Sequence, residues 1–478
     1  MLILDSVKKK VYLYNTMSRT VEEFVPINDK CVGLYGCGPT VYNYAHIGNL
    51  RTYIFEDTLK RVLRHAGFKV KHVMNITDVG HLTGDGDDGE DKMAKSARES
   101  GRSVWDIAKF YTDAFFKDYD SLNIIRPDVV CPATQHIQQM IDLIKRLEAG
   151  GHTYVAGGNV YFSIDTFPEY GKLAKLNLDD LKSGARIDID TNKRNPKDFV
   201  LWFTNSKFGE QAMMWDSPWG RGYPGWHIEC SAMSMYYLGE QFDIHCGGID
   251  AIPVHHTNEI AQSEAATGKK WVNYWMHGEF LLSDKGKMSK SSGEFLTMSV
   301  LTSHGYDPLD YRYFCLGATY RTQLQFSYQG MDGARTARLG LVDRIASLGD
   351  SVAPAASLSE KTRSYMDQFD SFVCNDLATA RGLSVLWTML KDDGITDAEK
   401  RHAVNYMDEV LGLGLDKIKA KKDDVSDIPA EVMELVQKRA QAKKNKDWAA
   451  ADSYRNQIDA MGYLLKDTPA GPSLQKKI

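Results

Sequence analysis

The sequence has few cysteines, few prolines and no long apolar run. Its 478 residues include seven cysteines and 14 prolines. An odd number of dispersed cysteines is not the disulfide framework of a small secreted domain, so we expect a reducing, cytoplasmic setting. The longest stretch without a charged residue, residues 31–50, contains four glycines, a proline, two asparagines and a histidine. That composition excludes a membrane span, and no basic segment followed by an apolar one opens the chain, so we expect no secretion signal.

An excess of positive charge is also absent. The chain has 58 basic and 63 acidic residues, for a net charge of −5. This balance argues against a protein that coats nucleic acid along its whole length. The last 62 residues differ, because they hold 13 basic and 9 acidic side chains. A local contact with nucleic acid in this tail is therefore compatible with the overall charge.

The 43% hydrophobic and 25% charged residues are typical of a folded protein, and the length predicts two to four domains. Residues 32–35, 70–76 and 242–245 are predicted strands that end at glycine or polar residues, and amphipathic helices follow. This alternation predicts an α/β fold with a parallel sheet. In such sheets ligands bind beyond the carboxyl ends of the strands, so the polar residues found there are candidate site residues.

The alternation breaks in the middle of the chain, and helical patterning dominates after about residue 306. We expect two halves of one sheet separated by an insertion, then a lysine-rich loop region, a helical bundle and a small C-terminal domain. The expected segments are 1–122 and 224–285 for the halves, 123–223 for the insertion, 286–350 for the loop region, 351–427 for the bundle and 428–478 for the C-terminal domain.

Two segments carry candidate phosphate chemistry. Residues 37–49 lead from a strand into a helix that is predicted to start at Leu50, and a helix start offers unpaired N–H groups that suit phosphate. His46 and Asn49 could both donate to a phosphate oxygen; alternatively, Asn49 only caps the helix. Residues 285–293 hold three lysines and three serines and could close over a polyphosphate. The alternative is a lysine-rich surface turn.

A third group has metal-ligand chemistry. His255 and Glu259 are four residues apart on a predicted helix and therefore project from one face. With Cys37 and Cys230 from separate strand ends, they would supply two thiolates, an imidazole and a carboxylate, which suits tetrahedral zinc. No Cys-x-x-Cys pair anchors the set. The alternative is that both cysteines are small buried hydrophobes and that His255 is a polar core residue.

The two phosphate motifs together resemble the paired signatures of class I aminoacyl-tRNA synthetases. Residues 46–49 read His-Ile-Gly-Asn and residues 287–291 read Lys-Met-Ser-Lys-Ser, in the order of that family. Residues 225–233 (Gly-Trp-His-Ile-Glu-Cys-Ser-Ala-Met) and 255–259 (His-His-Thr-Asn-Glu) narrow the resemblance to the cysteinyl-tRNA synthetase family. It spans nearly the whole chain.

The resemblance implies a Rossmann-type catalytic domain split by an insertion, followed by a helical bundle and a small anticodon-binding domain. It implies ATP-dependent attachment of L-cysteine to tRNA(Cys) through cysteinyl-adenylate, with Mg²⁺ accompanying ATP and one Zn²⁺ selecting the substrate thiolate. A soft metal would prefer thiolate to the hydroxyl of serine, which an apolar pocket rejects poorly. The implied partners are tRNA(Cys), L-cysteine and ATP, and we expect a monomer that binds no membrane.

The resemblance also assigns roles to residues. Zinc would be held by Cys37, Cys230, His255 and Glu259. ATP and its activation would involve His46, Asn49, Gly248, Asp250, Lys287 and Lys290. The substrate cysteine would meet Gly38, Thr77, Trp226 and His245, and Trp448 would stack on a tRNA base. Asp250 could instead cap a helix, and Trp226 and Trp448 could be packing residues. The sequence departs from the family at Asn49, where histidine is usual, and at Cys246, where glycine is usual.

Two rival functions have sequence signals that separate them from this one. An amino-sugar–cysteine ligase would use the same adenylate chemistry but would not need a tRNA-binding tail. A non-catalytic, metal-dependent RNA-binding protein would not need the lysine loop. Pyrophosphate exchange separates the second rival from both enzymes, and charging of a tRNA transcript separates the two enzymes.

Overall fold

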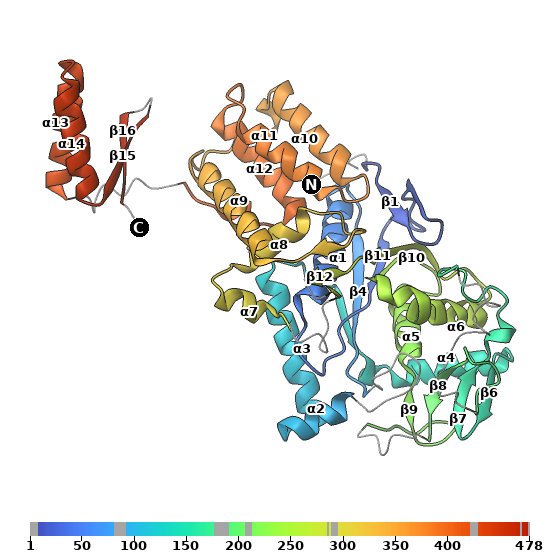
Figure 1. The fold of residues 1–478 in the computed structure, drawn as a ribbon. Helices are drawn as coiled ribbons and strands as arrows, with labels where there is room; N and C mark the ends of the chain where they lie inside the picture. Colours follow the sequence, from blue (N-terminus) through green and yellow to red (C-terminus); the bar gives the residue numbers. More distant parts are fainter. Residues whose placement is uncertain are drawn as a thin grey trace. The chain divides into compact units, whose positions relative to one another are not determined.

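The structure is a computed structural model that describes residues 8–80, 92–175, 191–205, 213–283, 286–287, 295–420, 429–468 and 471–476. The chain divides into two compact units, Met1–Lys419 and Ala420–Ile478 (Figure 1). Among the described residues, no helix has both the length and the apolar character needed to cross a membrane.

A five-stranded parallel sheet forms the centre of the first unit. Its order is β11–β10–β3–β4–β5, with β3 Val32–Gly36, β4 Val70–Ile76, β5 Val129–Pro132, β10 Phe242–Gly248 and β11 Val272–Gly278. All four pairings are parallel, so the carboxyl ends share one edge. From β3, the next two strands along the chain, β4 and β5, lie on one side of β3, and the later strands β10 and β11 lie on its other side. The crevice between β3 and β10 is therefore a topological switch point, where such sheets bind ligands.

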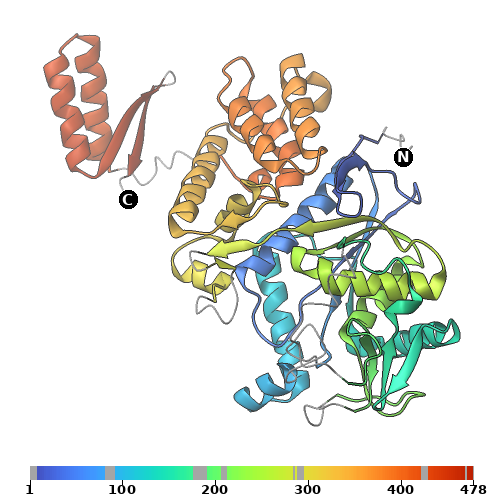
Figure 2. The same ribbon diagram turned by 45° about the vertical axis from the view of Figure 1, so that its right-hand side comes forward.

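Helices cover both faces of this sheet because alternate residues of each strand point to opposite sides. Leu34 and Ile244 join the core formed with α1 (Ile47–His65). Tyr35 and Val73 join the core formed with α4 (Ile137–Ala149), α5 (Trp226–Leu238) and α6 (Thr257–Thr267). Figures 1 and 2 show α1 and α5 on either side of β4 and β10. The predicted α/β fold with a parallel sheet is confirmed.

Further elements are inserted between the strands of the parallel sheet. Between β4 and β5 lie α2 (Lys92–Ser100) and α3 (Val104–Ser121). Between β5 and β10 lies a four-stranded antiparallel sheet of β6 (Thr153–Ala156), β7 (Asn159–Phe162), β8 (Phe199–Phe203) and β9 (Tyr223–Pro224). Strand β7 ends at Phe162, and a 3₁₀ turn begins at Ile164.

Small strands and helices complete the first unit. The strands are β1 (Tyr12–Asn15), β2 (Thr20–Glu23), β12 (Leu281–Ser283), β13 (Gly286–Lys287) and β14 (Leu324–Gln325). The helices are α7 (Met298–Ser303), α8 (Pro308–Leu316), α9 (Tyr328–Ala346), α10 (Glu360–Val373), α11 (Thr379–Leu390) and α12 (Asp397–Leu411). Helices α10, α11 and α12 pack on one another, and α12 also contacts α1.

The second unit has its own small core. It contains α13 (Ala430–Lys444), α14 (Trp448–Ala460) and an antiparallel hairpin of β15 (Tyr463–Thr468) and β16 (Gly471–Lys476). Val432, Ile458 and Leu465 are buried where the helices meet the hairpin.

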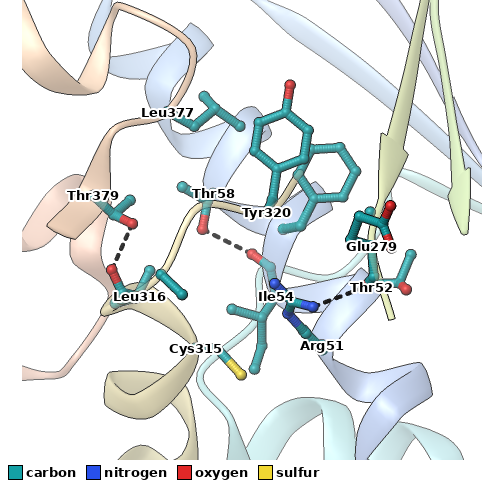
Figure 3. A pocket seen from close by; sticks show the side chains of 13 residues that line it. Arg51, Thr52, Ile54, Thr58, Glu279, Cys315, Leu316, Tyr320, Leu377 and Thr379 are labelled. Carbon is teal, nitrogen blue, oxygen red and sulfur yellow. Dashed lines mark hydrogen bonds between the residues drawn. The ribbon is translucent and has the colours of Figure 1, made fainter. Parts of the chain in front are cut away.

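Buried arginines and an aspartate fix the position of α1. The Arg51 guanidinium donates to the backbone carbonyls of Glu279, Phe280, Thr319 and Thr322 at 2.6–3.1 Å, beside a small cavity of about 30 Å³ (Figure 3). Further along the helix, buried Asp57 accepts from Arg61 at 2.7 Å and from Arg312 of α8 at 2.6 Å. Removing one partner of such a buried pair leaves an uncompensated charge, so these contacts hold the start of α1 at the sheet edge.

Candidate active site and metal centre

A cavity of about 460 Å³ lies at the switch point, and most of the predicted site residues line it. The predicted residues on its wall are Cys37, Gly38, His46, Asn49, Thr77, Trp226, Cys230, Gly248, Asp250 and His255. Glu259 and His245 are fully buried and contact each other, with the His245 Nε2 atom 2.8 Å from a carboxylate oxygen of Glu259. Residues from strand ends and helix starts far apart in the sequence thus meet at one edge of the sheet.

The other three predicted residues belong to other elements or lie outside the described residues. Lys287 is the last residue of β13, which pairs with β12, and Lys290 lies outside the described residues. Trp448 is the first residue of α14 in the second unit, and 60% of its surface is exposed.

The four predicted metal ligands converge. Single donor atoms of Cys37, Cys230, His255 and Glu259 all lie within 4.8 Å of one another. Cys37 directly follows β3, and Cys230 lies in the second turn of α5. The helix predicted to carry His255 and Glu259 begins as a π turn, Ile252–His256, and continues as α6. The His255 Nε2 atom is still 2.6 Å from Glu259 Oε1, because residues four apart remain on one face.

A second set of four residues shares two members with the first. Donor atoms of Cys37, His245, His256 and Glu259 also lie within 4.8 Å of one another. The Cys37 Sγ atom is 3.4 Å from His256 Nε2, and His256 Nδ1 is 2.8 Å from His277 Nε2. Two sulfurs with an imidazole and a carboxylate fit a tetrahedral zinc site, so the first set is the better donor set. The second set supplies imidazoles that orient the ligands from behind.

Sequence reasoning missed His256, His277 and Glu229. His277 is the penultimate residue of β11, and its Nδ1 atom is 2.7 Å from the Thr16 hydroxyl. Glu229 is fully buried beside Cys230 in the sequence, and it accepts a hydrogen bond from the Thr77 hydroxyl at 3.1 Å. A histidine at a strand's carboxyl end and a carboxylate inside the Trp-His-Ile-Glu-Cys motif are the signals that could have found them.

The charged groups of the buried cluster surround the thiol of Cys230. The hydrogen bond to Cys230, together with burial, raises the pKa of Cys37 well above its ordinary value, and the same bond lowers the pKa of Cys230. Burial would raise the pKa of Glu259, but His255 and His245 hold it well below its usual range. Burial would lower the pKa of His255, but Glu259 and Cys230 raise it to about 10. The protons on Cys37 and His255 are those that a bound metal cation would displace.

His256 and His277, behind the cluster, are held neutral. Burial lowers the pKa of His277 to about 3. Burial, and to a smaller extent the neighbouring His245, lowers the pKa of His256 well below its ordinary value. Neutral imidazoles can donate through one ring nitrogen and accept through the other, as a chain of hydrogen bonds requires.

The start of α1 differs from the prediction. The helix begins at Ile47 rather than Leu50, because His46 and Asn49 cap it reciprocally. His46 Nδ1 accepts from the Asn49 backbone N–H at 3.0 Å, and Asn49 Oδ1 accepts from the His46 backbone N–H at 3.2 Å. His46 is thus the N-cap, and Asn49 supports it from the third helical position. Because Nδ1 accepts, a neutral His46 carries its proton on Nε2.

The wall opposite α1 presents other predicted residues. The Trp226 ring stacks on His255 with centroids 4.3 Å apart. Gly38 crosses β4 so closely that a Cβ atom there would lie 1.6 Å from the Asn75 carbonyl oxygen, which requires glycine. Asp250 lies in a 3₁₀ turn, Ile249–Ala251, and is not the N-cap of the π turn that follows, where Ala251 takes that place. Cys246 is fully buried in the core on the α1 face of the sheet, which is consistent with a packing residue.

Comparisons with known proteins agree with this geometry. A family model for the class I (C) tRNA synthetase catalytic domain matches residues 23–336, and one for the cysteinyl-tRNA ligase anticodon binding domain matches residues 425–471. The crystal structure of Mycobacterium tuberculosis methionyl-tRNA synthetase bound by methionyl-adenylate aligns with a TM-score of 0.58 at 16% identity, over 81% of this chain and 93% of that one. The chain therefore has the fold and the catalytic domain of a class I tRNA synthetase.

Full-length relatives narrow the class. The chain is 53% identical to a cysteine–tRNA ligase of Treponema denticola, over 98% of this chain and 99% of that protein. It is 47% identical to cysteine–tRNA ligase 1 of Burkholderia lata, over 97% of this chain and 96% of that protein. The chain belongs to the cysteine–tRNA ligase family. The comparisons do not support the amino-sugar ligase alternative.

Proposed function

We propose that this protein attaches L-cysteine to tRNA(Cys) in two steps, with ATP as the energy source and zinc as the device that selects cysteine. The observation that carries the proposal is the convergence of two thiols, an imidazole and a carboxylate within 4.8 Å of one another in the cavity where α1 begins. The same cavity thus has donors for a soft metal and a helix start for phosphate.

In the first step, the carboxylate of cysteine attacks the α-phosphorus of ATP, and pyrophosphate leaves. The N-terminal turn of α1, with His46 and Asn49, would bind phosphate oxygens, and Lys287 and Lys290 would neutralise charge on the leaving pyrophosphate alongside Mg²⁺. Gly248 and Asp250 would bind the nucleoside, since a carboxylate at a strand end can accept from ribose hydroxyls. No protein nucleophile is required.

Cys37, Cys230, His255 and Glu259 would hold the zinc ion. A bound zinc would stabilise the thiolate of the substrate, which a hydroxyl cannot match. The protein residues around it would orient the substrate: Gly38, Thr77 and Trp226 from the cavity wall, and His245 from below. In the second step, a hydroxyl of the terminal adenosine of tRNA attacks the acyl carbon, and AMP leaves. The second unit would bind the anticodon, with Trp448 as its candidate stacking residue.

The test measures ATP–pyrophosphate exchange with cysteine and with serine, and then charging of a tRNA(Cys) transcript, on protein whose metal content is determined. We expect exchange with cysteine to exceed exchange with serine by more than 100-fold, and we expect one zinc per chain. Removal of the metal with a chelator should abolish this preference. Wild-type selectivity in a metal-free preparation would contradict the role of zinc, and exchange without tRNA charging would contradict the reaction.

A further inference from the structure

Three aromatic rings form a cluster at the mouth of the cavity, which we call the rim cluster: Tyr44, Phe110 and Tyr111. Their ring centroids are 6.0 Å apart for Tyr44–Phe110, 5.2 Å for Tyr44–Tyr111 and 5.1 Å for Phe110–Tyr111, and all three pairs meet edge to face. The cluster is open to solvent, because 43% of Tyr44 and 38% of Phe110 remain exposed. These rings contact one another, and part of the surface of Tyr44 and Phe110 remains accessible to a ligand.

The rim cluster is continuous with the site. Tyr44 lies two residues before His46 in the loop that leads into α1, and Phe110 and Tyr111 lie on α3. Tyr44 and Tyr111 line the same cavity as His46, Asn49 and the metal cluster. A chain that enters this cavity past Tyr44 therefore reaches the place where the adenylate would form.

The exposed position of the rim cluster is not needed for the packing of α3. The opposite side of that helix is buried through Phe115, Phe116 and Tyr119, which pack against one another and, through Phe115 and Tyr119, against Tyr53 of α1. The guanidinium of Arg102, just before α3, lies 4.8 Å from the centre of the Phe110 ring. The rim thus combines exposed aromatic surface with a cation, which are the two elements of sites that bind single-stranded nucleic acid.

We propose that the rim cluster stacks against bases of the single-stranded 3′ end of the tRNA as that end enters the cavity. This proposal rests on the proposed function, because only the transfer step brings a polynucleotide to the adenylate. Aromatic rings are suited to this task, since every base has a π-face and single-stranded RNA is commonly bound by stacking. The Arg102 guanidinium supplies positive charge for the phosphates between the stacked bases.

The experiment compares the two half-reactions in Phe110→Ala. ATP–pyrophosphate exchange should stay within about twofold of wild type, because Phe110 does not line the cavity. The kcat/KM for tRNA charging should fall about 10-fold, as expected for the loss of stacking on one base. Phe110→Trp should retain charging, whereas Phe110→Leu, which keeps the apolar bulk without the π-face, should not. Trp105→Ala is the matched control, because Trp105 is 53% exposed on another face of α3 and should affect neither reaction.

A second measurement tests contact directly, with binding of a full-length tRNA(Cys) transcript and of one shortened at its single-stranded 3′ end. If the rim cluster stacks on that end, the shortened transcript binds wild type and Phe110→Ala with equal affinity. The losses of affinity caused by the substitution and by the shortening are then not additive. Additive effects, or unchanged charging in Phe110→Ala with normal exchange, would overturn the proposal while leaving the proposed function intact. Equal losses in exchange and charging would also overturn it, since the cluster would then serve the adenylate pocket. Absent exchange in the wild type would instead overturn the proposed function.

Discussion

The floor of the cavity and its rim differ in burial and in the contacts that hold them. The floor consists of Cys230, His245, His256, Glu259 and His277, and at most 5% of any of them is exposed. Each is held by an ion pair or a hydrogen bond to another buried group, and the chain of contacts runs as far as Thr16. The rim consists of the loop before α1 and the exposed face of α3, where aromatic rings contact one another and solvent.

The difference corresponds to the two substrates that such a cavity must receive. Discrimination between a thiol and a hydroxyl requires donors whose positions are set before the substrate arrives, since any relaxation would accept both. Burial and complete pairing give the floor that rigidity. A nucleotide chain must enter and leave, and stacking on exposed rings tolerates different bases and modest shifts. The following predictions test how sharply the floor and the rim are separated.

The largest effect is expected from Cys230→Ala, in the floor. The substitution removes one of the four proposed metal ligands and leaves His255 and Glu259 without the sulfur beside them. We expect zinc content to fall below one-tenth of wild type and kcat/KM for cysteine in pyrophosphate exchange to fall by at least 100-fold. Metal analysis and exchange kinetics on the same preparation provide the measurement.

Cys374→Ala is the matched control for this variant. Cys374 is also a buried cysteine, but it lies at the end of α10, in the core with the helical bundle. Its replacement should lower stability slightly through the small cavity that it leaves, with no change in zinc content. A normal zinc content in Cys230→Ala would show that the floor does not bind metal through this thiolate.

A smaller effect is expected beneath the floor, at His72 of β4. A Cβ atom at Gly36, just before Cys37, would lie 3.2 Å from His72 Nε2, and within the described residues neither ring nitrogen of His72 has a hydrogen-bond partner. Burial, assisted by the charge of Lys60 and opposed by that of Asp128, lowers the pKa of His72 to about 3. The unfolded chain binds the proton below about pH 6.5, so the stability contributed by neutral His72 is lost as the pH falls from there towards 3.

His72→Phe should remove that loss. At pH 8 the variant should be about as stable as wild type, and at pH 5 it should be more stable by about 2 kcal/mol. Thermal unfolding across this range provides the measurement, and His304→Gln, a change at an exposed histidine, is the control that should keep the wild-type slope. Parallel slopes for His72→Phe and wild type would mean that the folded protein accommodates a charged His72.

The sequence contains the information for the ligands of the first set but not for the groups behind them. Cys37 follows a strand of the parallel sheet as predicted, whereas Cys230, predicted at another strand end, lies in the second turn of α5. Its place beside His255 and Glu259 therefore follows from the family resemblance and not from the geometry of strand ends. His277 could not be placed, since its contact with His256 depends on β11 lying beside β10, with His277 opposite Gly247. That neighbour relation is a long-range pairing that no local pattern encodes.

The start of α1 illustrates a different limit of sequence reasoning. His46 is an unusual N-cap, and Leu50 is the first strongly apolar position of the expected helical face after Ile47, so the pattern placed the helix three residues late. The reciprocal bonds with Asn49 depend on side-chain geometry rather than on residue type. The rim cluster was missed for a similar reason: Tyr44 and Phe110 are 66 residues apart and meet only because α3 packs beside α1.

The smallest effect is expected at Asn49, where the rim approaches the phosphate site. Asn49→Ala removes the acceptor of the His46 backbone N–H and the neutral donor that we propose for ATP, each of which is worth about 1 kcal/mol. We expect exchange to slow by about 10-fold, mainly through a higher KM for ATP, with zinc content unchanged. Asn49→His, which restores the residue usual in the family, should retain more of the exchange rate than Asn49→Ala.

Phe110→Ala should leave exchange unchanged, whereas Asn49→Ala should slow it. Together these two variants locate the boundary between the part of the rim that activates the nucleotide and the part that contacts tRNA. Equal exchange rates in Asn49→Ala and wild type would place that boundary deeper, between Asn49 and the floor.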